Sequence, residues 1–419
     1  MTVQRERSPR LYLPVMIALC FVIVSVPAQA QKFEVLHTFH KGEGPQGPSG
    51  VLTLDVEGNL YGVAGGGTGR CFTATSPCGT VYKMSETGQL VWVYSFKGPG
   101  TNGNGPATGL LRDANGNLFG VTENGGINTK ACDDNVQRIC GVVFKLDPTG
   151  KKETVLHRFS GGQYGWLPEA LLTEDSSGNL YGTTIWGGSP KNSGVVFKLD
   201  QAGRYKVLYR FWGGRDAAGL IQGPPGYLYS IDVVGSFGGP GFFQVDISTG
   251  KLSFLGSYGL LMDSVLLRDE AGNLYGTDSR GGQNYSGTIG KLTYANGTWS
   301  STVLYTFCPQ QYVCSDGQYP TIGPLVRDAA GNLYGTTIFG GEKGSNCNGD
   351  TCGVVFKLDT SGTESVLHTF TGGTDGAFPD GGLVMDAAGN LYGTTGQGGD
   401  FNCAFNAIKG CGVVFKITP

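Results

Sequence analysis

Short apolar runs alternate with tight polar segments along almost the whole chain after residue 30. Residues 322–370 hold one complete unit, with apolar runs at 322–327, 332–337, 353–358 and 365–370. Each run has the length of a β-strand, and the Gly, Asp and Asn residues between runs supply the chemistry of tight turns. The pattern predicts an all-β protein built from four-stranded units.

One phrase marks the turn between the first two strands of each unit. Gly-Asn-Leu-Tyr-Gly or a close variant begins at Gly58, Gly116, Gly178, Gly226, Gly272, Gly331 and Gly389, with spacings of 46 to 62 residues. A recurring period of this size is typical of repeat architectures, and four short strands per period are typical of a propeller blade. We therefore predict a seven-bladed β-propeller. The copy at Gly226 is degraded, so a ring of six blades is the alternative if that stretch is an insertion.

The polar residues of this phrase have a structural explanation. Asp386 precedes one of the turns and Gly389 lies within it. An Asp carboxylate can cap such a turn, and Gly can adopt the positive φ that the turn needs. We interpret the repeated Asp as a turn residue and not as a catalyst.

The two ends of the repeat array complement each other. Residues 33–39 match a fourth strand without a blade before it, and residues 412–418 match a third strand without a fourth after it. Pairing these segments would complete the last blade, close the ring and remove two exposed sheet edges. A linear solenoid would instead need polar capping units at its ends.

The first thirty residues differ from the repeats. Arginines at positions 5, 7 and 10 precede an apolar run over residues 11–26, and Ala-Gln-Ala follows at 28–30. This order is typical of a secretory signal peptide with a small-residue cleavage site, whereas an uncleaved membrane anchor needs a longer apolar run. We predict cleavage after Ala30, one seven-repeat domain over residues 31–419, no membrane span after cleavage, and export to the periplasm or beyond the cell.

The cysteines of the mature chain agree with export. They form five close pairs: Cys71/Cys78, Cys132/Cys140, Cys308/Cys314, Cys347/Cys352 and Cys403/Cys411. An even number of cysteines in an exported chain indicates disulfides. Zinc is the alternative, but these spacings lack the Cys-x-x-Cys and His ligands of common zinc sites.

The composition limits the classes of partner that this protein is expected to bind. Charged residues make up 15% of the chain, the formal net charge is −3, and no basic stripe is present, which argues against a nucleic-acid partner and suits a neutral ligand. Glycine accounts for 73 of 419 residues without a Gly-X-Y period, so collagen is excluded and turn-rich β structure is favoured.

Several segments of one unit together resemble a known repeat. They are Asp-x-x-Gly-Asn-Leu-Tyr-Gly-Thr-Thr at 328–337, Gly-Gly at 340–341, Gly-Val-Val-Phe-Lys-Leu-Asp at 353–359 and Val-Leu-x-x-Phe at 366–370. The combination is similar to the GloVer tandem repeat of "choice-of-anchor" exported bacterial proteins, and it covers essentially the whole mature chain. The resemblance implies a propeller and export, and it supplies no catalytic residues.

The long connections, which carry all five cysteine pairs, are expected on one face of the ring. Loops on a rigid scaffold are where binding usually resides, although disulfides also staple exported domains for stability alone. Aromatic residues gather in the same connections. Our candidate ligand-binding aromatics are Tyr164, Trp166, Trp212, Tyr312, Tyr319 and Phe378, whereas Trp186 and Phe339 are expected to pack between blades.

A second clue is the residue after Pro at the entry to the first strand, which lines the central channel. This residue is Ser49, Ala107, Glu169, Thr321 or Asp380 in different blades. A position that keeps its frame but changes its side chain suits a specificity rim. Glu169 and Asp380 belong to blades three and seven, nearly opposite each other, so we interpret them as ligand contacts and not as a glycosidase carboxylate pair.

The sequence gives little support for a catalytic or metal-binding site. His37, His157 and His368 share one strand position with Tyr209 and Tyr305, so this position is interpreted as structural. No nucleophile elbow, P-loop or Asp-x-Asp-x-Asp-Gly calcium loop occurs in the sequence, and we predict no metal, no cofactor and no catalytic residue.

These observations favour a binding module for an extracellular or cell-surface ligand, with carbohydrate as the preferred class. One alternative is a polysaccharide-active hydrolase or lyase that uses acids such as Glu123, Glu169, Asp278 or Asp380. The other is a protein-interaction scaffold, with the apolar residues Phe237, Phe242 and Phe243 of the degraded fourth unit at the interface.

Overall fold

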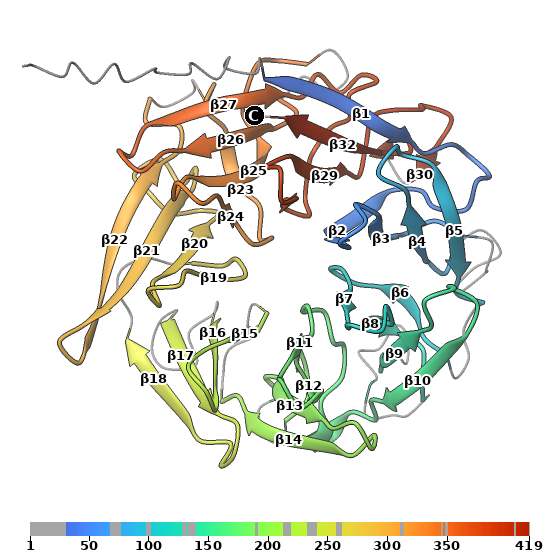
Figure 1. The fold of residues 1–419 in the computed structure, drawn as a ribbon, viewed down its shortest axis with the longest axis vertical. Coiled ribbons are helices and arrows are strands. Elements are labelled where there is room, and N and C mark those ends of the chain that lie inside the picture. The colour runs from blue at the N-terminus through green and yellow to red at the C-terminus, as the bar shows by residue number, and fades with distance from the viewer. Residues whose placement is uncertain are drawn as a thin grey trace, which may run out of the picture. The chain divides into compact units, whose positions relative to one another are not determined.

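The computed structural model confirms a ring of seven four-stranded blades around a central channel (Figure 1). The residues that it describes are 31–67, 77–97, 102–127, 132, 140–188, 192–212, 219–232, 241–256, 262–310, 314–344, 347, 351–405 and 408–418. The predicted signal peptide lies outside these ranges. Within them, no helix has the length and apolar character needed to cross a bilayer.

In blades 1 to 4, the strands follow one another from the channel outward. Blade 1 contains β2 (Pro48–Leu54), β3 (Leu60–Ala64), β4 (Thr80–Met84) and β5 (Leu90–Ser95). Blade 2 contains β6 (Asn104–Pro106) and β7 (Leu111–Arg112), then β8 (Leu118–Asn124), β9 (Val142–Leu146) and β10 (Glu153–Arg158). Blade 3 contains β11 (Thr173–Glu174), β12 (Leu180–Thr184), β13 (Val195–Leu199) and β14 (Tyr205–Arg210). Blade 4 contains β15 (Ile221–Gln222), β16 (Tyr227–Asp232), β17 (Gly241–Asp246) and β18 (Leu252–Gly256).

Blades 5 to 7 have the same order. Blade 5 contains β19 (Leu267–Arg268), β20 (Leu274–Asp278), β21 (Thr288–Ala295) and β22 (Thr298–Thr306). Blade 6 contains β23 (Gln318–Pro320) and β24 (Val326–Arg327), then β25 (Leu333–Phe339), β26 (Val354–Leu358) and β27 (Glu364–Thr369). Blade 7 contains β28 (Val384–Met385), β29 (Leu391–Thr395), β32 (Val413–Thr418) and β1 (Lys32–Thr38), and a small hairpin of β30 (Ala404–Phe405) and β31 (Ile408–Lys409) lies in its connecting loop.

Blade 7 joins the two ends of the chain, as the sequence predicts. β1 pairs antiparallel with β32, from Lys32 opposite Thr418 to Thr38 opposite Val413. The N-terminal strand therefore supplies the outermost strand of the last blade and closes the ring (Figure 1). The degraded unit at Gly226 is a genuine four-stranded blade, so the six-bladed alternative is wrong.

The hydrophobic core lies between successive blades. Third strands such as β13, β26 and β32 are buried at almost every position except the lysine, because blades pack against both faces of each sheet. The lysine ammonium lies over the ring of the tyrosine opposite it, 5.6 Å from the ring centroid for Lys198 over Tyr181. This cation–π contact explains why Val-Val-Phe-Lys and Leu-Tyr-Gly occur together in the repeat.

The glycine after that tyrosine leaves room for the aromatic ring of the third strand. A Cβ at Gly120 would lie 2.6 Å from Cζ of Phe144, closer than real Cβ contacts allow. The same pairing brings Gly182 against Phe197 and Gly335 against Phe356. The repeat therefore needs glycine at this position for packing and not for flexibility.

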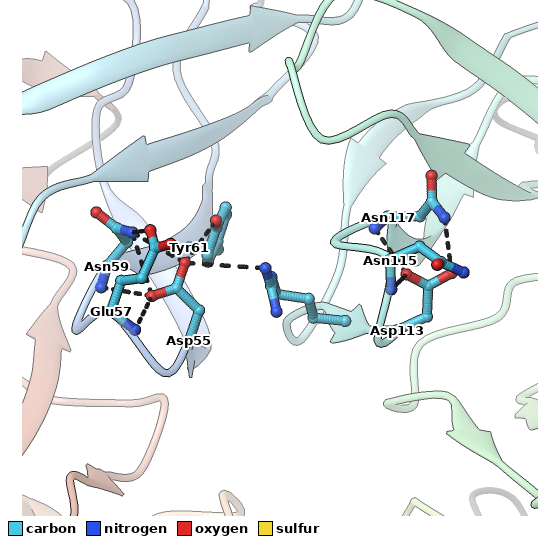
Figure 2. Close-up of polar contacts among 8 residues, drawn as sticks. Asp55, Glu57, Asn59, Tyr61, Asp113, Asn115 and Asn117 are labelled. Carbon is cyan, nitrogen blue, oxygen red and sulfur yellow. Dashed lines mark hydrogen bonds and ion pairs between the residues drawn. The ribbon is translucent and has the colours of Figure 1, made fainter.

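Turns on one side of the ring, between the first and second strands and between the third and fourth strands, form what we call the turn face. The Asp-x-x-Gly-Asn turns lie on this face, and Figure 2 shows two of them, around Asp55 and Asp113. Asp55 accepts the backbone N–H of Asn59 at 2.8 Å, the Nδ2 of Asn59 at 2.9 Å and the hydroxyl of Tyr61 at 2.9 Å. The repeated Asp is therefore a turn residue, and its carboxylate is fully used in holding the hairpin.

Neighbouring turns are linked across the blade boundary. The guanidinium of Arg112 lies 4.0 Å from the Asp55 carboxylate and 5.7 Å from the centroid of the Tyr61 ring. Arg112 directly precedes Asp113 of the next blade, so a residue of one turn reaches the Asp–Tyr pair of the turn before it.

The remaining connections form the opposite side of the ring, which we call the loop face. Four predicted cysteine pairs are disulfides on this face: Cys132–Cys140, Cys308–Cys314, Cys347–Cys352 and Cys403–Cys411. Cys78 is also disulfide-bonded, and Cys71 lies outside the described residues. The disulfide prediction is confirmed for these four pairs.

The fourth blade is covered by its neighbour. The long hairpin of β21 and β22 places Trp299 against Phe242, with ring centroids 5.0 Å apart, and against Tyr229 at 5.9 Å. Phe242 and Phe243 are both buried. These two residues therefore belong to the core and not to an exposed interface, which corrects that part of the scaffold hypothesis; Phe237 lies outside the described residues.

Candidate functional site

A cavity of about 610 Å³ lies in the central channel, where the first strands enter from the loop face. We call it the channel mouth. Its described wall carries four carboxylates, from Glu123, Glu169, Asp263 and Asp380. Between them lie apolar side chains: Val51, Leu171, Ile185, Val265, Ile322 and Ile338. None of the described residues that line the mouth is Lys, Arg or His.

Two positions of the repeat supply nine residues of this wall, including all four carboxylates. The first lies three residues before the buried leucine of the first strand and holds Ser49, Ala107, Glu169, Asp263, Ile322 and Asp380 in successive described blades. The second lies four residues after the aromatic residue of the Leu-Tyr-Gly phrase and holds Glu123, Ile185 and Ile338. Because both positions fall where strands reach the loop face, every blade can contribute different chemistry to one cavity.

Four of the five predicted rim residues line the mouth, and in two blades a different residue takes this place. Ser49, Ala107, Glu169 and Asp380 line the mouth. Thr321 is buried, and its hydroxyl lies 3.0 Å from that of Thr336, because blade 6 has an extra residue between Pro320 and Leu325 that brings Ile322 to the rim. Asp263 escaped prediction because Met262 stands where other blades have proline. Counting back from the leucine, and not forward from the proline, would have found it.

Three carboxylates of the mouth, from Glu123, Asp263 and Asp380, lie in surroundings that disfavour charge. Burial raises the pKa of Glu123 and of Asp263, and Ser279 opposes this rise by donating its backbone N–H to Asp263 at 3.0 Å. Asp380 is exposed to the cavity, yet protein surrounds it inside the ring and raises its pKa to about 7. At neutral pH, Asp380 can therefore act as either donor or acceptor toward a bound molecule.

The candidate aromatics divide into three groups. Trp166 is only 5% exposed and stacks on Trp186 at 5.8 Å, so it supports the core beside Cys132 and Cys140 and does not present its ring to solvent. Tyr164, in the 3-10 turn η2 (Gly162–Tyr164), is 47% exposed, and Trp212 is 63% exposed, but neither lines the mouth. Tyr312 lies outside the described residues.

Tyr319 and Phe378 hold equivalent places, directly before the proline at the rim. Both have positive φ, 55° and 54°, and both are half-buried. Their rings lie on either side of Phe339, with centroids 5.9 and 5.4 Å away. These two side chains lie behind the wall of the mouth and do not line it. Phe339 packs between blades 6 and 7, as expected.

The shared His/Tyr position holds the connections between blades. His368 Nε2 lies 3.2 Å from Asp375, and the hydroxyl of Tyr305 donates to Asp316 at 2.8 Å. Each of these carboxylates also accepts the backbone N–H that follows the strand, from Thr371 or Cys308. In these two blades the ring interacts with the carboxylate. Nε2 of His157 has no hydrogen-bond partner among the described residues, so the position accepts His or Tyr without requiring this contact.

Asp278, another candidate acid, does not line the mouth. It is buried, and its carboxylate accepts the backbone N–H of Arg280 at 2.9 Å. In the described part of the chain, no three His, Cys, Asp or Glu side chains lie close enough together to hold a metal ion.

Comparison with known proteins places the repeat. The model of the Gloeobacter/Verrucomicrobia repeat matches residues 216–419. This match agrees with the resemblance seen in the sequence and covers residues 216–419. The Gloeobacter/Verrucomicrobia region thus spans blades 4 to 7 and includes the rim residues Asp263, Ile322 and Asp380. No curated protein matches the chain.

Solved structures share the ring. A streptogramin B lyase is 16% identical over 93% of this chain and 97% of its own, with a TM-score of 0.57. Virginiamycin B lyase from Staphylococcus aureus is 11% identical over 93% of this chain and 99% of its own, with a TM-score of 0.56. At these identities the likeness concerns the propeller fold alone.

Proposed function

We propose that this protein is an exported binding module that holds a carbohydrate, or another ligand rich in hydroxyl groups, in the channel mouth. The observation that carries the proposal is the wall of the mouth, where carboxylates from four blades alternate with aliphatic side chains. Its volume of about 610 Å³ falls in the range of small-ligand sites, roughly 300–1,000 Å³. The disulfides and the apolar run before residue 30 favour export.

The chemistry of the wall suits a sugar. Carboxylates accept hydrogen bonds from hydroxyl groups, and charge-assisted hydrogen bonds are about twice as strong as neutral ones. The C–H faces of a sugar ring can pack against Val51, Ile185 and Ile322, and Ile322 is 56% exposed. Without a cation among the described lining residues, an anionic ligand would meet only repulsion.

The test uses the mature chain, residues 31–419, on a panel of polysaccharides and oligosaccharides, with retention and soluble-sugar release recorded together. Loss of one charge-assisted hydrogen bond costs about 1.5–3 kcal/mol, so Glu169→Gln and Asp380→Asn should each weaken binding about tenfold or more. Glu342→Gln removes a charge from the exposed surface of the loop face, away from the mouth, and should leave binding unchanged.

Three outcomes would redirect the proposal. If Trp212→Ala with Tyr164→Ala abolishes retention while the rim variants retain it, the site is an aromatic surface of the loop face and not the mouth. If neither set of variants changes retention, binding resides elsewhere and the proposal fails. If the protein neither binds nor cleaves any member of the panel, a protein partner becomes the favoured ligand.

A second candidate is a polysaccharide-active hydrolase or lyase. It is favoured by the pKa of Asp380, about 7, because an acid that titrates near neutral pH can both donate and accept a proton during a reaction. Soluble sugar released by the wild-type chain and lost in Asp380→Asn would establish it. Retention without release would favour the binding module.

A further inference from the structure

The rim carboxylates Glu169 and Asp380 are attached to the blade before their own. Leu167, two residues before Glu169, donates its backbone N–H to the carbonyl of Cys140 at 3.1 Å. Phe378, two residues before Asp380, donates in the same way to Cys352 at 2.9 Å. Cys140 and Cys352 are each the second cysteine of a disulfide in the preceding blade.

The proline between these two residues tightens the same junction. Pro168 packs on Gly141, which directly follows Cys140, so closely that a Cβ at Gly141 would lie 2.6 Å from the proline Cδ. Pro379 packs on Gly353 with a corresponding distance of 3.0 Å. The rim residue thus leaves a proline whose φ is fixed and whose ring is seated on the neighbouring blade.

Residues with a side chain adopt a left-handed conformation at these two junctions, as Tyr319 also does at the blade 6 junction. Leu167 and Phe378 have φ of 57° and 54°, a region that is unfavourable for residues with a side chain. At the corresponding places before the neutral rim residues Ser49 and Ala107, the chain has Gly47 and Gly105, which adopt positive φ without strain. Strained residues persist only where the surroundings hold them, and they gather at functional sites.

We propose that the disulfides Cys132–Cys140 and Cys347–Cys352 are positioning elements of the channel mouth, each setting one carboxylate in the following blade: Glu169 for the first and Asp380 for the second. This inference rests on the proposed binding function of the mouth and adds the residues that support it. The disulfide fixes the carbonyl, the carbonyl holds the left-handed residue, and the proline carries that constraint to the rim.

Two other disulfide-bonded cysteines make the same contact, since Cys411 and Cys78 accept the backbone N–H of Gly47 and Gly105 at 2.9 Å each, but the rim residues that follow are the neutral Ser49 and Ala107. The remaining junctions differ. The blade 6 junction has Ser286 in place of the cysteine, and the described residue that reaches the mouth there is the uncharged Ile322. Asp263 lacks the proline and is held by Ser279 instead. The four cysteines of the two disulfides are at most 1% exposed, so they act as fixed supports and not as a redox switch.

A double-mutant cycle separates positioning from general stability. Cys347→Ser with Cys352→Ser should weaken sugar binding about tenfold, as is typical when the support of a binding group is removed. In an Asp380→Asn background the same pair should produce no further loss, whereas in a Glu169→Gln background the tenfold loss should remain. Cys132→Ser with Cys140→Ser should show the opposite dependence, so each junction tests the other.

Cys308→Ser with Cys314→Ser is the matched control, because the rim residue that follows this disulfide is the uncharged Ile322, and binding should be unchanged. An equal loss in every background, or no loss at either junction, would overturn the proposal. Thermal melts of each variant identify any that fail to fold, and either junction alone suffices for the test.

A readout that needs no ligand distinguishes this proposal from the binding function. The Asp380 carboxyl can be titrated by 13C NMR; removal of Cys347–Cys352 should lower its pKa toward the ordinary value, because a loosened rim admits water, and removal of Cys132–Cys140 should not. If the titration moves but no sugar binds to the wild type, the proposed function fails and the positioning role stands. If sugar binds but the titration and the cycles show no coupling, the positioning role fails.

Discussion

The turn face repeats one polar network in six blades, whereas the channel mouth presents a different side chain in almost every blade. On the turn face, the Asp carboxylates accept the backbone N–H of an Asn at 2.8 to 3.0 Å and its Nδ2 at 2.7 to 2.9 Å. At the mouth, equivalent positions hold Ser49, Ala107, Glu169, Asp263, Ile322 and Asp380. One backbone repeat therefore supports two kinds of surface.

Under the proposed function, this difference separates the side chains that stabilise the fold from those that contact the ligand. A turn-face Asp accepts its hydrogen bonds from donors within six residues of the chain, so its hydrogen-bonding capacity is used mainly within its own hairpin. Asp328 illustrates the electrostatics: burial alone would raise its pKa, but hydrogen bonds from Asn332 and Tyr334 lower it below its usual value. At the mouth the pKa values of Glu123, Asp263 and Asp380 are raised instead, because burial disfavours their charged forms.

Substitution of glycines on the two surfaces is expected to give the largest difference in stability. Gly141 has φ of 82°, and a Cβ there would collide with the carbonyl of Thr122 and crowd Pro168. Gly389, on the turn face, has φ of 87° but nothing within 4 Å of the added Cβ. Backbone strain alone costs about 1–2 kcal/mol, and overpacking adds about 1–3 kcal/mol.

We therefore expect Gly141→Ala to lower the free energy of unfolding by about 3 kcal/mol or more, and Gly389→Ala by about 1 kcal/mol. Urea denaturation of the two variants measures the difference. Equal losses would mean that close approach between blades does not constrain the junction at the rim.

The Asp network gives the next largest effect, and the chain contains its own control. Asp328 accepts from Asn332 and from the hydroxyl of Tyr334, whereas Asp113 accepts from Asn117 but faces Phe119, which has no hydroxyl. Asp328→Ala would leave the buried tyrosine hydroxyl without its acceptor. We expect it to lower the unfolding free energy by about 3 kcal/mol, and Asp113→Ala by about 1 kcal/mol less.

Thermal or urea unfolding of the two variants checks this ranking, and Tyr334→Phe in the Asp328→Ala background should recover part of the difference. If Asp113→Ala proves as damaging as Asp328→Ala, the tyrosine hydroxyl contributes nothing to the turn.

The repeat made the fold predictable because its constraints are local. The turn chemistry of Asp328 and Gly331 fixes the hairpins, and the complementary end segments fix the closure through β1 and β32. The rim was predictable in outline because Pro168 and Pro379 mark it. The sequence did not predict the rim residues Ile322 and Asp263, because one inserted residue and one missing proline change the register in their blades.

The aromatics could not be assigned from sequence because burial in a connection depends on distant partners. Trp166 is buried because Trp186, which follows the second strand of the same blade, stacks against it. The two residues also exchange backbone hydrogen bonds at 2.9 and 3.2 Å. Trp212 lies in a similar connection yet stays exposed. Composition indicates that an aromatic residue lies in a loop, but the direction of its ring is set by tertiary contacts.

The smallest expected effect is a pH dependence at the mouth that the turn face should not share. Asp380 has a folded-state pKa of about 7 against an ordinary value of 3.8. Between these values the folded protein binds a proton that the unfolded chain has released, so the Asp380 contribution to stability falls as pH rises from about 4 to about 7 and is constant above. Water in the cavity reduces the size of this effect, since Asp380 is exposed there.

We therefore expect Asp380→Asn to gain stability relative to the wild type as pH rises across this window. Urea unfolding of both proteins at several pH values, compared as a difference curve, measures it. Glu342→Gln, at an exposed position outside the mouth, should give a flat difference curve. A flat curve for Asp380→Asn as well would show that the rim carboxylate is as well solvated as a surface acid, and would remove the electrostatic contrast between the mouth and the turn face.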